Sequence, residues 1–205
     1  MNPLELFLVR HGESEGNRDK RFTGHGPSPL SPRGFAQAEA TGAALAAMNI
    51  DHIYVSDLVR TRQTAAPLLA LTKITPVILA EIRERDMGRF VGLSFEEVQV
   101  QYPDAWNAIL ARDPEYAPPE GESHRACGDR VACFLDALRE KHPHGRVVVV
   151  SHGVAIHHML RHLLGVPLGA VFFQSDNCCI HHVELRGGNH VRVVALNDRK
   201  HLAEA

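Results

Sequence analysis

Residues 4 to 17 read LELFLVRHGESEGN, and this stretch decides how the rest of the chain is interpreted. Leu4–Val9 is a compact apolar run, which predicts a buried strand. Arg10, His11 and Gly12 follow at once, so two polar side chains and a flexible residue stand where the strand ends. In open α/β sheets, ligands bind beyond the carboxyl ends of the strands. The stretch therefore predicts a strand that leads into a binding site.

Three further predicted strands each end in a polar cluster of the same kind. The strand at 52–55 precedes SDLVRTRQT, and the strand at 76–79 precedes EIRERDMG. The run RVVVV at 146–150, typical of a strand buried on both faces, precedes SHG. Because the carboxyl ends of parallel strands share one edge of a sheet, we expect all four clusters to converge at a single rim.

Predicted helices alternate with these strands. Apolar spacing and punctuation by proline predict helices over residues 32–48, 58–71, 94–101, 123–141 and 154–164. Ser31 is a predicted N-cap, Ser94 and Glu97 a capping box, and Ser56 or Asp57 a cap for the second helix. The alternation predicts a three-layer α/β/α sandwich with a mostly parallel central sheet.

Two features fall outside this alternation. The last two predicted strands, 178–185 and 190–196, are joined by the turn RGGN and should pair antiparallel at or near a sheet edge. The segment at about 85–125 is interpreted as a cap-like insertion over one end of the sheet. We expect its larger apolar side chains to form a local core rather than a ligand surface; these are Met87, Phe90, Tyr102, Trp106 and Tyr116.

Length and charge narrow the class of protein. A chain of 205 residues suits one domain, 1–205, and its net charge of −2 offers no basic excess for nucleic acid or an anionic membrane. The apolar run at 4–9 is too short for a signal sequence or a membrane span. We expect a cytoplasmic protein without nucleic-acid or membrane partners, and the sequence leaves a homodimer open.

The chain has 14 histidines, several of them in the segments 157–162 and 181–182. His158 and His162 stand four residues apart on a predicted helix, a spacing that metal sites use. However, there is no HExxH glutamate between them and no evident third ligand. We therefore expect surface histidines and no metal, although the role of these segments stays open.

The predicted rim has the residue types of metal-free phosphoryl transfer. Arg10 and Arg60 carry fixed charges on forked donors that suit phosphate. His11 can act as a nucleophile when neutral, and nearby arginines favour that form. A carboxyl group beside a phosphate dianion has a raised pKa and can hold a proton for a leaving group. The candidates for this acid are Glu84 and its neighbours in type, Glu13, Glu81 and Asp86.

Taken in order, the clusters resemble the histidine phosphatase superfamily, which includes the cofactor-dependent phosphoglycerate mutases. The matching stretches span nearly the whole chain: LVRHGESEGN, LSPRGFAQAEATG, VSDLVRTRQTA, EIRERDMGRFVG, PPEGES and VVVVSHG. Three residues such as RHG recur by chance, whereas an ordered set with a strand before each of four clusters is specific. The resemblance implies a phosphoglycerate mutase-like fold, and we expect neither a metal nor a cofactor.

The resemblance also implies the role of each catalytic residue. His11 matches the histidine that becomes a phosphohistidine, and Arg10 and Arg60 match the arginines that hold the phosphoryl oxygens. His152 matches the second histidine, a donor to the transferring group. Glu84 matches the acid that protonates the leaving alkoxide and then activates water in the branch whose acid follows the third strand.

Four further positions are expected to bind substrate or phosphate. Asn17 matches a polar phosphate contact, and Thr23 and Gly24 are candidate loop contacts. Gly153 stands where the other branch of the family has its aspartate, which supports Glu84 as the acid.

The expected activity is that of a phosphomonoesterase rather than a mutase. Mutases of this family match ERHYG where this chain has ERDMG, and residues 93–122 offer only Arg112 as a positive charge. A pocket poor in cations lets water compete for the phosphohistidine. A phosphoglycerate mutase and a non-catalytic phosphate-binding protein remain alternatives, and the small phosphate ester that serves as substrate is not specified.

Overall fold

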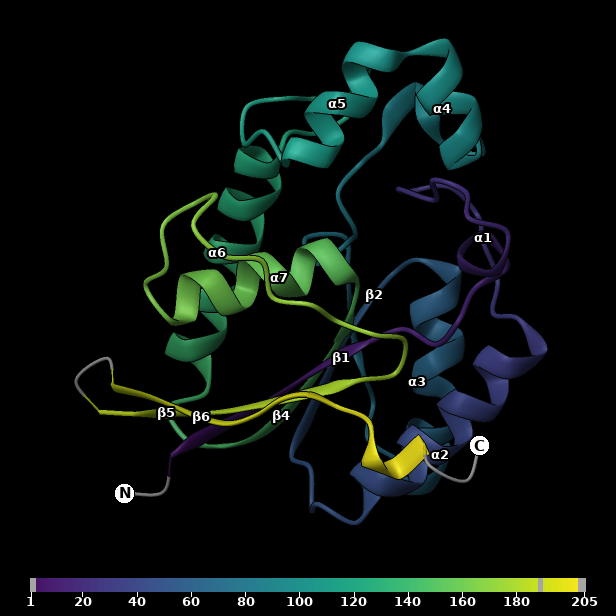
Figure 1. The fold of residues 1–205 in the computed structure, drawn as a ribbon. Helices are drawn as coiled ribbons and strands as arrows, with labels where there is room; N and C mark the ends of the chain where they lie inside the picture. Colours follow the sequence, from purple (N-terminus) through teal and green to yellow (C-terminus); the bar gives the residue numbers. More distant parts are fainter. Residues whose placement is uncertain (1–2, 188–189, 203–205) are drawn as a thin grey trace.

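The computed structural model describes residues 3–187 and 190–202, and Figure 1 shows a twisted sheet flanked by helices. Its six strands lie in the order β3-β2-β4-β1-β5-β6. The strands are β1 (Leu4–Arg10), β2 (His52–Ser56), β3 (Val77–Leu79), β4 (Gly145–Ser151), β5 (Ile180–Arg186) and β6 (His190–Asp198).

Strands β1 to β4 run parallel, and the last two strands are antiparallel to their neighbours. β4 pairs in parallel with both β1 and β2, and β2 pairs in parallel with β3. β5 runs antiparallel to β1, and β6 runs antiparallel to β5 at the edge of the sheet. These pairings confirm the mostly parallel sheet and the antiparallel edge pair. The predicted turn at 186–189 lies partly outside the described residues.

The valine run of β4 explains why both faces of the sheet are covered. Val147 and Val149 belong to a core cluster shared with α6 and α7, whereas Val148 and Val150 belong to a cluster shared with α2 and α3. Because side chains alternate between the faces of a strand, an unbroken apolar run requires apolar cover on both. The covering helices are α2 (Pro32–Ala46), α3 (Val59–Thr72), α6 (His124–Lys141) and α7 (Gly153–Leu163).

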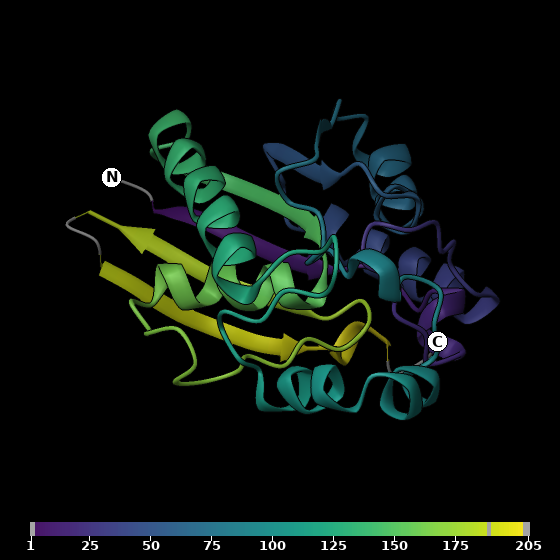
Figure 2. The same cartoon turned by 90° about the horizontal axis from the view of Figure 1, so that it is seen from above.

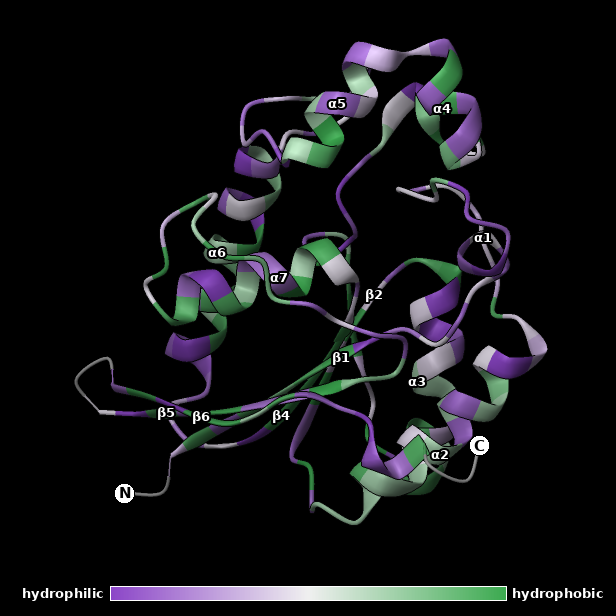
Figure 3. Cartoon of the chain, in the orientation of Figure 1, coloured by the Kyte–Doolittle hydropathy of each residue, from purple (hydrophilic) through white to green (hydrophobic). Residues whose placement is uncertain are grey.

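Figures 1 and 2 show the resulting three layers, with α2 and α3 on one side of the sheet and α6 and α7 on the other. Figure 3 shows the hydrophobic colouring concentrated in the central strands, while the helices alternate between hydrophilic and hydrophobic faces. The predicted three-layer α/β/α sandwich is thus confirmed. None of the helices in the described part of the chain is both long and apolar enough to span a bilayer.

Two short helices form a cap above the carboxyl edge of the sheet. They are α4 (Phe95–Gln101), which starts at the predicted Ser94 capping box, and α5 (Pro103–Ala111) (Figure 1). Met87 and Phe90 are buried in a separate small cluster, with Trp106 packed against it. The expected local core is therefore present for Met87, Phe90 and Trp106, but the prediction is wrong for Tyr102, which is exposed. Met87 also lines a cavity beside the loop that follows β3.

The N-terminal cap predicted for α3 is wrong. The helix begins after Leu58, and no side chain caps it. Ser56 is instead the last residue of β2, and its Oγ lies 2.9 Å from Nε2 of His152. The Asp57 carboxylate pairs with the Arg83 guanidinium at 2.5 Å. Both side chains are used in contacts near the rim, so neither satisfies the first turn of α3.

The expectation of surface histidines is also wrong for most of the histidine clusters. His157, His158 and His181 are buried, while His162 is partly exposed and its ring lies 2.9 Å from the Asp136 carboxylate. His157 and His158 lie on the inner side of α7, where the helix packs on its neighbours. Within residues 3–187 and 190–202, no group of three or more His, Cys, Asp or Glu is placed to hold a metal ion.

Candidate active site

The four polar clusters meet at the carboxyl edge of the parallel strands. Arg10 ends β1 and His11 follows it, while Arg60 lies in the first turn of α3. Glu84 lies in the loop after β3, and His152 directly follows β4. The structure brings these five residues together at this edge of the sheet.

His11 is buried as a neutral imidazole. Its Nδ1 lies 2.7 Å from the Gly12 carbonyl oxygen. Because a carbonyl oxygen only accepts, Nδ1 carries the hydrogen and Nε2 keeps a lone pair. Burial lowers the pKa of His11 well below its usual value, and the charges of Arg60 and Arg10 lower it further. The ring is thus held in the form that can attack an electrophile.

Arg60 is a fully buried cation that forms no ion pair with a carboxylate of the described residues, although the charge of Glu84 acts on it. One Nη donates to the Gly24 carbonyl at 2.8 Å, and Nε donates to Nδ1 of His152 at 3.2 Å. Burial lowers the pKa of Arg60 to about 10, which leaves it charged at neutral pH. An unpaired buried charge is costly, so the site favours an anionic ligand.

Arg10 supplies a second unpaired positive charge. One Nη donates to the Ser175 carbonyl oxygen at 2.6 Å, while Nε is enclosed and lacks a hydrogen-bond partner. Gly153 lies directly against this guanidinium, since a Cβ added there would be 3.6 Å from Nε. An enclosed N–H without a partner costs free energy that an anion in the site would recover.

His152 contacts Arg60 through one ring nitrogen and Ser56 through the other. Since Arg60 Nε can only donate, Nδ1 of His152 accepts and Nε2 donates to Ser56 Oγ. Burial, followed by the charge of Arg60, lowers the pKa of His152 well below its usual value. The ring lies 5.2 Å from that of His11, between centroids. In this arrangement His152 orients Arg60, and its direct donation to a phosphoryl group stays a prediction.

The Glu84 carboxylate sits at the N-terminus of α7. Oε1 accepts the backbone N–H groups of Val154 at 3.1 Å and Ala155 at 3.2 Å. It also accepts the N–H of Arg85 at 2.9 Å. Glu84 lines a cavity of about 270 Å³, whereas the other candidate acids Glu13, Glu81 and Asp86 do not line it.

One arginine of α6 holds the loop that carries Glu84. Arg130 donates to the backbone carbonyls of Glu81 at 2.6 Å, Arg83 at 3.2 Å and Glu84 at 3.3 Å. Its remaining donors bind the Glu122 carboxylate at 2.8 and 3.0 Å. The loop that carries Glu84 forms neither a helix nor a strand. The hydrogen bonds from Arg130 therefore hold its backbone in place of hydrogen bonds within a regular element.

The predicted loop contacts line the same cavity. Asn17, Thr23 and Gly24 all border it. Oδ1 of Asn17 accepts the Ser14 backbone N–H at 3.3 Å and the Asn177 side-chain amide at 3.1 Å. Only the Nδ2 donors of Asn17 are then left for a ligand, which suits a phosphate oxygen.

Close backbone packing supports the segment that follows β1. A Cβ added to Gly34 in α2 would lie 2.0 Å from the carbonyl oxygen of Glu13, and one added to Gly12 would lie 2.6 Å from the Gly34 carbonyl oxygen. Both residues must therefore lack a side chain for the loop beside His11 to rest on α2.

Sequence reasoning missed the contribution of residues 175–178. Besides Ser175, the Asn177 side chain donates to the His11 carbonyl at 3.1 Å, and the Cys178 N–H donates to the Arg10 carbonyl at 3.1 Å. No apolar periodicity or charge pattern marks this segment in the sequence. Its function depends on β5 lying beside β1, which only the fold reveals.

Comparison with known proteins agrees with this geometry. The model of the histidine phosphatase superfamily, branch 1, matches residues 6–199. The chain belongs to this superfamily. A relative named probable phosphoglycerate mutase GpmB, from Klebsiella pneumoniae, is 32% identical over 183 residues, with 88% of this chain and 85% of the relative covered.

Two solved structures of the superfamily resemble the chain over most of its length. The alpha-ribazole phosphatase from Shigella flexneri has a TM-score of 0.87 at 26% identity, with 95% of this chain and 96% of that chain covered. The mycobacterial glucosyl-3-phosphoglycerate phosphatase has a TM-score of 0.87 at 25% identity, with 97% and 100% covered. The predicted superfamily and phosphoglycerate mutase-like fold are therefore confirmed, as is the assignment to the histidine phosphatases.

Proposed function

We propose that this histidine phosphatase is a metal-independent phosphomonoesterase that acts on a small phosphate ester in the cytoplasm through a phosphohistidine at His11. One observation carries this proposal. A neutral imidazole whose Nε2 keeps its lone pair lies within the electrostatic influence of Arg60 and Arg10, two guanidinium groups that form no ion pair with a carboxylate of the described residues. The arrangement suits a phosphoryl group bound for attack at phosphorus.

The first step transfers the phosphoryl group to the enzyme. The Nε2 lone pair of His11 attacks phosphorus, and the bond between phosphorus and the ester oxygen breaks. The departing oxygen takes the proton of the Glu84 carboxyl group. Arg10 and Arg60 stabilise the charge on the equatorial oxygens, while His152 keeps Arg60 in place.

The second step regenerates the enzyme. The Glu84 carboxylate takes a proton from water as the water oxygen attacks phosphorus. The bond between phosphorus and Nε2 breaks, so inorganic phosphate leaves and His11 recovers its lone pair. Neither step requires a metal or a cofactor.

Hydrolysis of p-nitrophenyl phosphate in excess EDTA tests this function. We expect sustained turnover and an acid-labile, base-stable phosphoryl group on the quenched enzyme. His11→Ala should lower kcat by at least about 10³-fold, because the nucleophile is removed. His162→Ala, a histidine of α7 outside the site, is the matched control. Full activity of His11→Ala would refute the mechanism, and an inactive wild type would favour the non-catalytic alternative.

A mutase remains the second candidate because the cavity is richer in cations than residues 93–122 suggest. Arg21 and Arg85, which lie outside that segment, line it together with Arg112. Arg21 is already bound to the Gly92 carbonyl at 2.8 Å and pairs with Glu97 at 3.5 Å. Conversion of 3- to 2-phosphoglycerate, primed with the bisphosphate and faster than release of free phosphate, would overturn the assignment as a phosphatase.

A further inference from the structure

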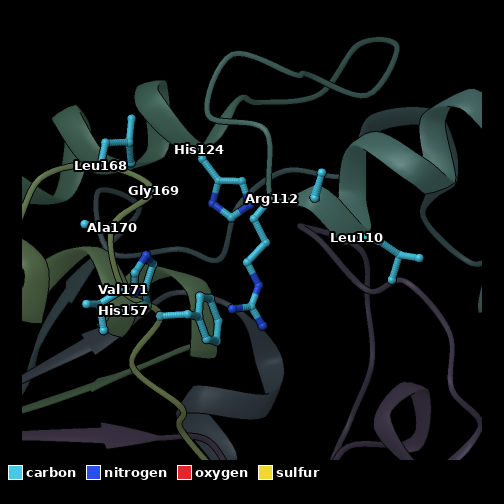
Figure 4. A pocket seen from close by; sticks show the side chains of 10 residues that line it. Leu110, Arg112, His124, His157, Leu168, Gly169, Ala170 and Val171 are labelled. Atoms are coloured by element: carbon cyan, nitrogen blue, oxygen red, sulfur yellow. The ribbon is translucent and has the colours of Figure 1, made fainter.

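Of the proposed catalytic residues, Glu84 is the one that lines the cavity of about 270 Å³. This cavity borders a second one of about 360 Å³, and Arg112, His124 and Phe172 line both. Figure 4 shows Arg112 and His124 reaching toward the same space from different elements. Arg85 lines the part nearer to Glu84. We call Arg85, Arg112 and His124 together the distal subsite.

Arg85 is a buried cation with an unused donor. Only 4% of the residue is exposed, and Nε donates to the Glu122 carbonyl oxygen at 2.9 Å. Nη2 is enclosed and has no hydrogen-bond partner. The Glu122 carboxylate forms its ion pair with Arg130, and none with Arg85, among the described residues. Burial lowers the pKa of Arg85 from its usual value, while the charges of Glu84 and Glu122 act in the opposite direction.

Arg112 presents its guanidinium at the border between the cavities. Its central carbon lies 3.5 Å from the centroid of the Phe172 ring. Stacking on a ring uses the face of the guanidinium and leaves its in-plane N–H groups free to donate. No carboxylate of the described residues forms an ion pair with Arg112; the adjacent Asp113 accepts the Glu115 N–H and lines neither cavity.

A chain of hydrogen bonds sets the tautomer of His124. Arg161 Nε donates to Nδ1 of His158 at 3.4 Å, so the hydrogen of His158 is on Nε2. That nitrogen lies 3.1 Å from Nδ1 of His124, which must accept, and the hydrogen of His124 is therefore on Nε2. Burial lowers the pKa of His124 to about 3, so the ring is neutral and offers one N–H beside Arg112.

We propose that the distal subsite binds a second anionic group, a carboxylate or phosphate carried by the leaving group of the substrate. Two guanidinium groups and one oriented N–H converge there from the catalytic loop, the cap and α6. Among the described residues that line the two cavities, Glu84 is the only acidic one, and backbone N–H groups already hold its carboxylate. This inference rests on the proposed function in one respect, because it assumes that the phosphoryl group of the substrate binds at His11.

Specificity toward paired substrates tests the subsite. The ratio of kcat/KM for 3-phosphoglycerate, which has a carboxylate, to that for glycerol 3-phosphate, which has an uncharged leaving group, should exceed about tenfold. Fructose 1,6-bisphosphate replaces the carboxylate with a second phosphate and distinguishes the two anions. Arg112→Gln and His124→Phe should each lower the preferred ratio by about tenfold or more, mainly through KM, since a hydrogen bond to a charged group is lost.

Arg89→Gln is the matched control, because Arg89 lies in the cap region but pairs with exposed Glu120 and lines neither cavity. Ratios near one in the wild type, or variants that lower kcat/KM equally for all substrates, would refute the subsite. If no ester were hydrolysed, the proposed function would fail by itself. Calorimetric binding of 3-phosphoglycerate and glycerol 3-phosphate would then test the subsite, with equal affinities as the refuting result.

Discussion

Arg60 donates from Nε to Nδ1 of His152 across 3.2 Å, so the second histidine of the site is a hydrogen-bond acceptor for a buried arginine. This contact makes the orientation of the Arg60 guanidinium depend on the tautomer of a neutral ring. It also links β4, which His152 follows, to α3, which carries Arg60.

His152→Phe should lower kcat for p-nitrophenyl phosphate by about 10²-fold. Phenylalanine would still fill the space of the His152 ring. Arg60 would lose the acceptor that orients it toward the equatorial oxygens of the phosphoryl group. Steady-state kinetics measure this loss, and Ser56→Ala should cost less because Nδ1 still accepts from Arg60. Equal losses in both variants would argue against the orienting role.

Glu84→Gln should affect poor leaving groups more than good ones. Glutamine cannot supply a proton, so kcat/KM for glycerol 3-phosphate, which reports the transfer of the phosphoryl group to His11, should fall by about 10²- to 10⁴-fold. p-Nitrophenolate leaves without needing a proton, so kcat/KM for its ester should fall much less. Glu81→Gln provides the control, since Glu81 does not line the cavity. A uniform loss for both esters would exclude Glu84 as the general acid.

Stability should fall as the solution is acidified below pH 6.5. Burial lowers the pKa of His181 and of His157 to about 4, against about 6.5 in an unfolded chain. Between pH 6.5 and 4 the unfolded state therefore binds protons that the folded state does not, which favours unfolding. Each such histidine should contribute about 1.4 kcal/mol per pH unit to the slope.

Urea denaturation at several pH values between 7.5 and 4.5 measures that slope. His181→Gln should reduce the slope by about 1.4 kcal/mol per pH unit, the contribution of one proton. A free energy of unfolding that stays constant over this range would contradict the burial of these histidines in neutral form.

Gly34→Ala should destabilise the protein and lower its activity together. The new methyl group would overlap the Glu13 carbonyl oxygen, and a backbone atom cannot move aside as a flexible side chain can. We expect a loss of about 1–3 kcal/mol in the free energy of unfolding, with a lower kcat because the segment beside His11 is displaced. Gly187→Ala is the control, because an added Cβ there meets nothing within 4 Å. A Gly34→Ala variant with wild-type stability would refute the packing argument.

Part of the rim was predictable, because Arg10, His11 and His152 stand at the carboxyl ends of apolar strands and parallel strands must end at one edge. Arg60 and Glu84 lie several residues beyond their strands, so this rule alone does not place them. Arg85 was concealed within a run of alternating charges, which in most proteins is a solvated surface. Likewise, the burial of His157 and His158 depends on how α7 packs on α6. Polar residues in a helical sequence do not predict such a tertiary contact.

Helix α6 begins with His124 in the distal subsite and, less than two turns later, carries the arginine that grips the loop of Glu84. One helix therefore connects the proposed distal subsite to the loop that carries Glu84, the proposed proton donor. A change in the tilt of α6 would displace His124 and the Glu84 loop together. Binding of the leaving group and transfer of the proton to it would therefore change together.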